Sequence, residues 1–190
     1  MSGDAFSKKK RQYGKGLSFC IIYSVFCVFF GLAYVTLNTN ECYTVKSSKV
    51  PVDITVNPDA NNTTEWFNLT LTIGFWSYLG AAVSSLGYLA KNGPLQYVTS
   101  MTEKFSRYII YAVFVCVHVM RLSHTGSVCS GDYLPKSERS DSIVQNYNIA
   151  TGEFFLTYII LGWVAVPSIL ITVLCIKGDS WAALILDAPK

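Results

Sequence analysis

Residues 69–90, "LTLTIGFWSYLGAAVSSLGYLA", decide the fold class because they contain no charged side chain. A helix rises about 1.5 Å per residue, so about 20 apolar residues cross the hydrocarbon core of a bilayer. Residues 154–176, "FFLTYIILGWVAVPSILITVLCI", form a second uncharged segment of similar length. We predict that both segments are membrane-spanning helices.

Two further apolar segments extend this pattern. Residues 17–37 carry no charge and are longer than the apolar part of a cleaved signal peptide, so we interpret them as a retained anchor. Residues 105–128 form the remaining segment, with Arg121 near its end. The chain is 51% hydrophobic and 14% charged, which fits poorly with a water-facing surface. The predicted fold is all-α, a polytopic bundle of four transmembrane helices with two lumenal or extracellular loops.

Lysine and arginine predict the orientation, because basic loops stay on the cytoplasmic side. Five of these residues lie in the segment 1–16, three in the segment 91–107 and two after the last span, against five in the other two loops. We therefore predict cytoplasmic termini, with a basic tail at 1–16, a transmembrane domain at 17–178 and an amphipathic tail at 179–190. The basic cluster lies at one end of the chain, which favours membrane lipid over nucleic acid as a partner.

The two outer loops contain cysteines and glycosylation sequons. Cys42 and Cys129 are the only cysteines outside the spans, and an oxidising compartment favours a disulfide between them. The alternative is two unpaired thiols in a mitochondrial or reducing compartment. Sequons at Asn61, Asn62 and Asn68 lie in the first outer loop, where N-glycosylation would agree with a lumenal face. We expect an integral membrane protein of the plasma membrane, the ciliary membrane or the secretory pathway.

An arginine between two histidines ends the third apolar segment. Positions three apart are neighbours on a helix, so His118 and His124 are predicted to flank Arg121 in a structural polar cluster. The acidic residues near this face are Glu41, Glu65, Asp132 and Glu153. Glu153 is the preferred partner of Arg121, because its span starts at the same face. Two histidines six apart on one helix differ by about 120° and cannot be opposite axial ligands of one haem iron, so we predict no cofactor and no metal.

Small residues form a stripe on the second span. Close packing drives helix association in lipid, so small side chains mark a contact face. The predicted face consists of Gly74, Ser77, Gly80, Ala81, Ser84 and Gly87. Contact with the other helices of the same chain and contact with a second protomer remain open alternatives.

Two resemblances follow from this layout and from one motif. Four spans with cytosolic ends are similar to the layout of MARVEL-type tetraspan proteins. The segments "RLSHTGSVCSGDYL" at 121–134 and "GEFFLTYIILGW" at 152–163 resemble a family of uncharacterised four-span proteins encoded in ciliate genomes. The resemblance implies a signature formed by Arg121, Ser123, His124, Gly126, Cys129, Ser130, Gly131 and Asp132. It implies a structured exit turn fixed by Cys129, and it implies no reaction.

The sequence favours a structural role over catalysis. It contains no nucleophile elbow, phosphate loop or metalloprotease motif, so we do not expect an enzyme. The preferred function is a membrane scaffold that self-associates or packs with partner membrane proteins. The alternatives are a subunit of an oligomeric four-span channel, which predicts ion conductance, and a supernumerary subunit of a mitochondrial membrane complex, which predicts unused sequons and reduced thiols.

Overall fold

The computed structural model describes the chain except residues 1, 38–40, 90–93, 136–145, 166–167 and 169–190. The described chain is mostly helical, and the all-α prediction is confirmed. The elements are α1 (Ser2–Thr36), β1 (Tyr43–Thr44), β2 (Asn61–Asn62), α2 (Thr63–Ser85), η1 (Leu86–Leu89), α3 (Pro94–Leu122) and α4 (His124–Cys129). A last helix, Ile149–Ala165, follows these elements and is called the C-terminal helix below.

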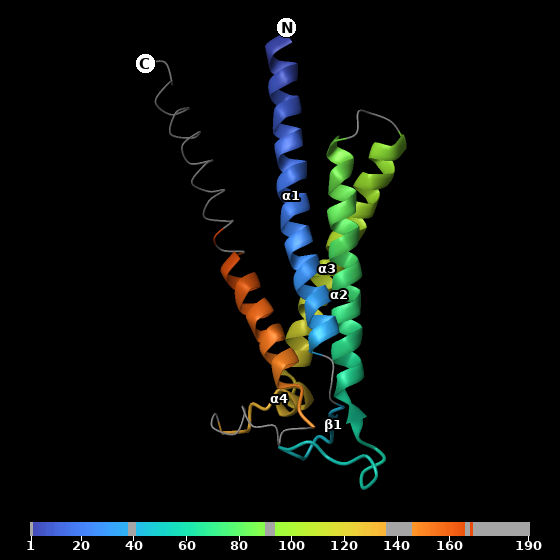
Figure 1. Ribbon diagram of the computed structural model, residues 1–190, viewed down its shortest axis with the longest axis vertical. Helices are drawn as coiled ribbons and strands as arrows, with labels where there is room; N and C mark the ends of the chain where they lie inside the picture. Colours follow the sequence, from blue (N-terminus) through green and yellow to red (C-terminus); the bar gives the residue numbers. More distant parts are fainter. Residues whose placement is uncertain (1, 38–40, 90–93, 136–145, 166–167, 169–190) are drawn as a thin grey trace, which may run out of the picture.

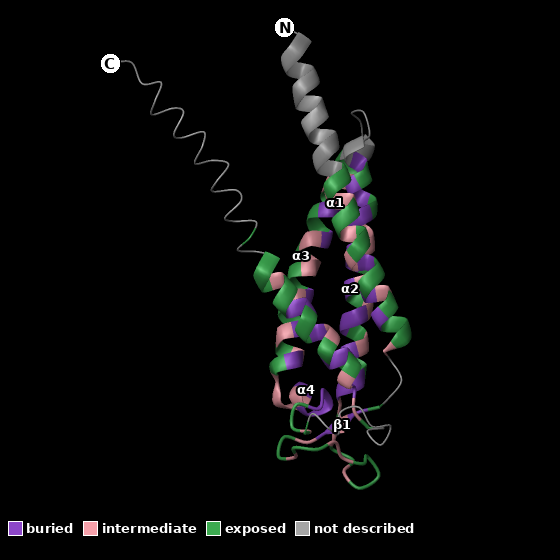
Figure 2. Ribbon diagram, turned by 60° about the vertical axis from the view of Figure 1, so that its left-hand side comes forward, coloured by how far each residue is buried: buried purple, intermediate pink, exposed green. Residues whose placement is uncertain are grey.

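The four long helices lie side by side and alternate in direction (Figures 1 and 2). The connection from α1 to α2 and the connection from α3 to the C-terminal helix lie at the same end of the bundle. We call this end the cap, and it comprises the described residues of 41–62 and 123–148. The short helix η1 lies at the opposite end, where α2 turns toward α3.

The start of α2 is fixed by the residue before it. The side chain of Asn62 accepts a hydrogen bond of 3.3 Å from the backbone N–H of Glu65, which satisfies a donor that the first turn would leave unpaired. The negative Glu65 carboxylate lies in this first turn, where it interacts favourably with the positive end of the helix dipole. Strands β1 and β2 pair antiparallel just outside the helix, with Tyr43 opposite Asn62.

The core of the bundle is aromatic. Tyr158 of the C-terminal helix lies at its centre, with ring centroids 5.0 Å from Phe30 of α1 and 5.7 Å from Phe114 of α3. The hydroxyls of Tyr78 and Tyr158 are hydrogen-bonded at 2.7 Å, so two buried polar groups are paired with each other. A second ring contact joins Phe67 of α2 to Phe155 at 5.2 Å. All four long helices therefore meet through aromatic side chains.

Many large apolar residues of the long helices are exposed, and Figure 2 colours the exposed positions along these helices green. Those on α1 and α3 include Leu17, Ile21, Val28, Leu32, Val35, Tyr97, Met101, Phe105, Tyr108, Val115, Val119 and Leu122. Glu103 and Arg121, by contrast, are buried, with only 1% and 5% of their surface exposed. Soluble domains have the opposite arrangement, with charged residues outside.

Two described helices are long and apolar enough to cross a membrane, judged by length and composition. These segments are Leu17–Thr36 and Tyr97–Leu122. The C-terminal helix is apolar but shorter within its described part. The expected span 69–90 does not qualify, because the Ser and Thr residues of α2 lower its mean hydropathy. The structure thus shows two candidate spans, with two more helices packed beside them.

The helix bounds differ from the predicted bounds at three places. α1 begins at Ser2, so the helix includes residues 2–16 of the segment that was predicted as a separate tail. α3 begins at Pro94 and ends at Leu122, instead of covering 105–128. It ends there because Ser123 is extended and its hydroxyl accepts a bond from the Gly126 N–H at 3.1 Å, which starts α4. The expected fourth span is described up to Ala165 and at Ser168, and its other residues lie outside the described part of the chain. The tail 179–190 also lies outside it.

Candidate functional site

A disulfide between Cys42 and Cys129 joins the two connections of the cap, and this prediction is confirmed. The two Cα atoms are 5.9 Å apart, and both residues are fully buried. The cysteines are separated by 87 positions in the sequence. The bridge therefore links the residues just before β1 to the end of α4.

A buried hydrogen-bond network surrounds the disulfide. The Thr64 hydroxyl accepts from the Cys42 N–H at 2.7 Å and from the Asn148 amide at 2.7 Å. The Cys129 carbonyl accepts from the Asn148 N–H at 2.8 Å, and the Cys42 carbonyl accepts from the Thr63 N–H at 3.0 Å. These bonds join both connections to the start of α2 and to the residue before the C-terminal helix. They fix the geometry of the cap.

Arg121 is anchored in the cap by three hydrogen bonds. Its two terminal nitrogens donate to the Asp132 carboxylate at 2.5 and 2.7 Å, and its Nε donates to the Gly152 carbonyl at 2.9 Å. The predicted pairing with Glu153 is wrong, because Glu153 is exposed on the next helix. The turn at Gly131, whose φ is +70°, precedes Asp132 and allows the chain to double back toward Arg121.

The two histidines do not join Arg121 in one cluster. His124 lies on α4, beyond the helix break at Ser123, so the expected three-residue spacing along one helix does not apply. Its Nε2 is 2.8 Å from the Ser48 carbonyl, across the cap. His118 lies on α3 and contacts Trp163 of the C-terminal helix. Each histidine therefore joins a different pair of segments, and the predicted cluster is not formed.

The small residues of α2 and η1 pack against the helices of the same chain. A side chain at Gly74 would collide with the ring of Phe30 on α1, and one at Gly87 would collide with Thr99 on α3. Gly80 faces the hydroxyl of Ser106 on α3. The remaining members of the predicted stripe, Ser77, Ala81 and Ser84, are buried. At Gly74, Gly80 and Gly87 the contacts are therefore with α1 and α3 of the same chain.

A charged pair at the other end of the bundle was missed by the sequence analysis. Glu103 is fully buried and accepts a bond of 2.5 Å from Arg107, four positions later on α3. The Arg107 guanidinium lies 5.7 Å from the ring centre of Phe19 on α1, at a cation–π distance. Glu103 lies just before the predicted span 105–128, and Arg107 lies inside it. Their four-residue spacing was the signal for a helix.

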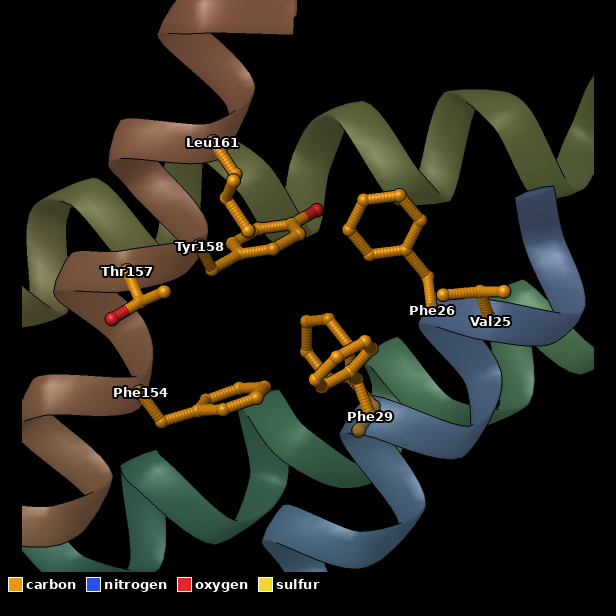
Figure 3. A pocket seen from close by; sticks show the side chains of 8 residues that line it. Val25, Phe26, Phe29, Phe154, Thr157, Tyr158 and Leu161 are labelled. Carbon is orange, nitrogen blue, oxygen red and sulfur yellow. The ribbon is translucent and has the colours of Figure 1, made fainter.

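An apolar cavity of about 290 Å³ opens between α1 and the C-terminal helix (Figure 3). Figure 3 shows Phe26 and Phe29 of α1 facing Phe154 and Tyr158 across it. The full lining is Val25, Phe26, Phe29, Phe30, Phe154, Thr157, Tyr158 and Leu161. The lining contains no charged side chain and is apolar apart from Thr157 and Tyr158, so it offers mainly hydrophobic contact.

The three sequons occupy different environments. Asn61 is exposed on β2, whereas Asn62 is half-buried and caps α2 through its side-chain oxygen. Asn68 is half-buried within α2 itself. Of the three, Asn61 is the most accessible, and glycosylation of all three stays a prediction.

Comparisons of the chain with protein-family models, curated proteins and solved structures give no match. Within the described residues, no group of three or more His, Cys, Asp or Glu side chains is placed to hold a metal ion. The functional argument therefore depends on the cap, the exposed apolar faces and the packing between helices.

Proposed function

We propose that the chain is a four-span integral membrane scaffold that self-associates through its cap. The observation that carries this proposal is the distribution of side chains, with Glu103 and Arg121 inside and large apolar groups outside. Full burial of one such apolar side chain is worth about 1.5–3 kcal/mol relative to water. Contact of these apolar side chains with lipid is favourable, whereas their contact with water is unfavourable.

The antiparallel arrangement supports four crossings. α2 and the C-terminal helix lie beside the two candidate spans, and the serines of α2 form bonds within the helix, such as Ser77 to the Ile73 carbonyl at 2.6 Å. Hydroxyls bonded in this way expose no unpaired donor to lipid. The polar content that lowers the hydropathy of α2 is therefore compatible with a helix that crosses the bilayer between α1 and α3.

The cap has the properties of a contact surface. The disulfide and its hydrogen bonds fix its base, while Val50, Ile54 and Val56 on the loop between β1 and β2 are 55%, 42% and 74% exposed. The Thr55 N–H and hydroxyl both donate to Asp53, which lowers the pKa of that carboxyl and orders the tip of the loop. Exposed apolar side chains on a rigid aqueous surface favour contact with another protein.

The orientation follows from charge and from the disulfide. The cytoplasmic side is proposed for the termini, because ten of the fifteen basic residues lie on that side. The cap would then lie in the lumen or outside the cell, where a disulfide persists. In this setting the self-association surface faces away from the cytosol.

The experiment compares two triple variants in lipid nanodiscs or mild detergent. Replacement of Val50, Ile54 and Val56 by serine removes the apolar groups, and the control exchanges valine for isoleucine and isoleucine for valine at the same positions. We expect the particle mass to fall to that of one protomer in the serine variant and to stay unchanged in the control. A wild-type chain that is a single protomer at all concentrations, or soluble without lipid, would contradict the proposal.

A further inference from the structure

The contact between His118 and Trp163 requires a neutral imidazole. Trp163 Nε1 lies 2.8 Å from His118 Nε2, and an indole N–H can only donate. His118 Nε2 therefore carries no hydrogen. His118 Nδ1 lies 2.7 Å from the Phe114 carbonyl, which can only accept, so the hydrogen is on Nδ1. The geometry fixes both the charge and the tautomer of this side chain.

We propose that protonation of His118 loosens the C-terminal helix from α3, which makes this contact a pH-sensitive switch. A proton added at Nε2 would place an N–H directly opposite the indole N–H, and the hydrogen bond would be lost. Histidine is the side chain whose unperturbed charge change falls closest to physiological pH, which makes it the common group in pH-sensitive contacts. The hydrogen bond to the Phe114 carbonyl would survive, so the change is confined to the link between helices.

His124 provides an internal contrast. Its Nε2 lies 2.8 Å from the Ser48 carbonyl, so this nitrogen is the donor. Its Nδ1 lies 3.4 Å from the Tyr133 hydroxyl, which donates to it in the neutral state. After protonation Nδ1 can donate to the phenol oxygen instead, so both contacts remain. The chain contains only these two histidines, which allows each effect to be assigned.

Few of the described residues near His118 are charged. On α3 the nearest is Arg121, one turn further along, and it is paired with Asp132 from the cap. The C-terminal helix carries no charged side chain from Phe154 to Ala165. Its titratable group nearest to this contact is Tyr158, whose ring lies 5.7 Å from that of Phe114. The one carboxylate on the described C-terminal helix is Glu153, which is exposed and lies ten positions before Trp163.

Loss of this bond would act on the cavity between α1 and the C-terminal helix. Phe114 packs against Tyr158, and a side chain at Gly162 would collide with the Phe114 ring, so the two helices are in close contact here. Tyr158 and Leu161 belong to the wall of the cavity. A shift of the C-terminal helix would therefore change the cavity. This inference does not depend on self-association, because all the groups belong to one chain.

The first test is the tautomer of each histidine in the full chain, measured by nitrogen NMR with labelled histidine in nanodiscs. At neutral pH we expect His118 to carry its hydrogen on Nδ1 and His124 on Nε2. Each set of nitrogen signals is assigned to its histidine by substitution. The signals of His118 disappear in His118→Gln, and those of His124 disappear in His124→Gln. A neutral His118 with its hydrogen on Nε2 would overturn the inference without any need for the variants to be active.

The second test uses a chain in which Trp163 is the only tryptophan, after replacement of Trp66, Trp76 and Trp181 by phenylalanine. Between about pH 8 and pH 5 we expect a one-proton transition in Trp163 emission, with a loss of intensity on the acidic side. His124→Gln should keep this transition. His118→Gln should remove it, because the glutamine oxygen still accepts the bond and does not titrate. Two results would refute the switch. One is a transition that persists in His118→Gln, and the other is an emission that does not change with pH in the single-tryptophan chain that keeps His118.

Discussion

Asp132→Asn is the most informative substitution in the cap. The Arg121 side chain is only 7% exposed, so its charge has left water almost completely, and Asp132 supplies the compensating charge. Asparagine can still accept one hydrogen bond from the guanidinium, but it leaves the charge buried and uncompensated. Breaking a buried pair in this way costs about 3–5 kcal/mol. The Asp132 side chain is 33% exposed, so part of the pair is solvated and the lower limit applies.

We therefore expect Asp132→Asn to lower the free energy of unfolding by about 3 kcal/mol, or about a hundredfold in the ratio of folded to unfolded chain. The measurement is reversible unfolding in mixed detergent micelles, followed by circular dichroism. Arg121→Met combined with Asp132→Asn should cost less than Asp132→Asn alone, because no unpaired charge is left.

The control is Glu153→Gln, which removes the carboxylate that the sequence favoured as the partner of Arg121. Glu153 is exposed, so this change should stay within about 0.5 kcal/mol. Equal effects of Glu153→Gln and Asp132→Asn would refute the assignment of the ion pair. A double variant as unstable as the sum of its single variants would show that the two residues do not interact.

Three further predictions concern the disulfide, the helix contact and the sequons. Cys42→Ser should lower the free energy of unfolding by about 4 kcal/mol, because the bridge closes a long loop, whereas Cys20→Ser should leave it nearly unchanged; both are measured by denaturant titration. Gly74→Ala should cost about 1–3 kcal/mol, because the buried Phe30 ring has little room to move, and a cost near zero would contradict the packing. Asn61→Gln should abolish the glycosidase-sensitive mobility shift in secreting cells, whereas the other two sequon substitutions should preserve it.

The helices and the disulfide could be predicted because their signals are local or few in number. Uncharged segments of spanning length identify helices without any knowledge of their neighbours. The pair Cys42 and Cys129 was favoured because these were the only cysteines outside the predicted spans, with two unpaired thiols as the alternative. The partner of Arg121 could not be found in this way. It depends on the turn at Gly131, and nothing in the spacing of acidic residues distinguishes Asp132 from Glu153.

The end of α3 and the burial of Glu103 could not be predicted from the sequence either. The residues after Leu122 are Ser, His, Thr, Gly and Ser, which do not mark one helix end, so the break at Ser123 is located only by its capping bond to Gly126. Glu103 looked like a loop residue because charges near a span usually lie in water. It pairs with Arg107 on the same helix, and its neighbours Ser106 and Thr99 face Gly80 and Gly87 across the contact between helices. Such contacts are a property of the packed bundle and not of any one segment.

The position of the disulfide divides the molecule into a closed ring and two arms. The ring runs from Cys42 through α2 and α3 to Cys129, and α1 and the C-terminal helix leave it at the same end. If α1 and the C-terminal helix move apart, they rotate about the disulfide. The displacement of each helix then grows with distance from the disulfide. The aromatic side chains between the arms act as the closing contact. A ligand or a neighbouring protein that wedges between the arms would be felt most strongly at the face opposite the cysteines.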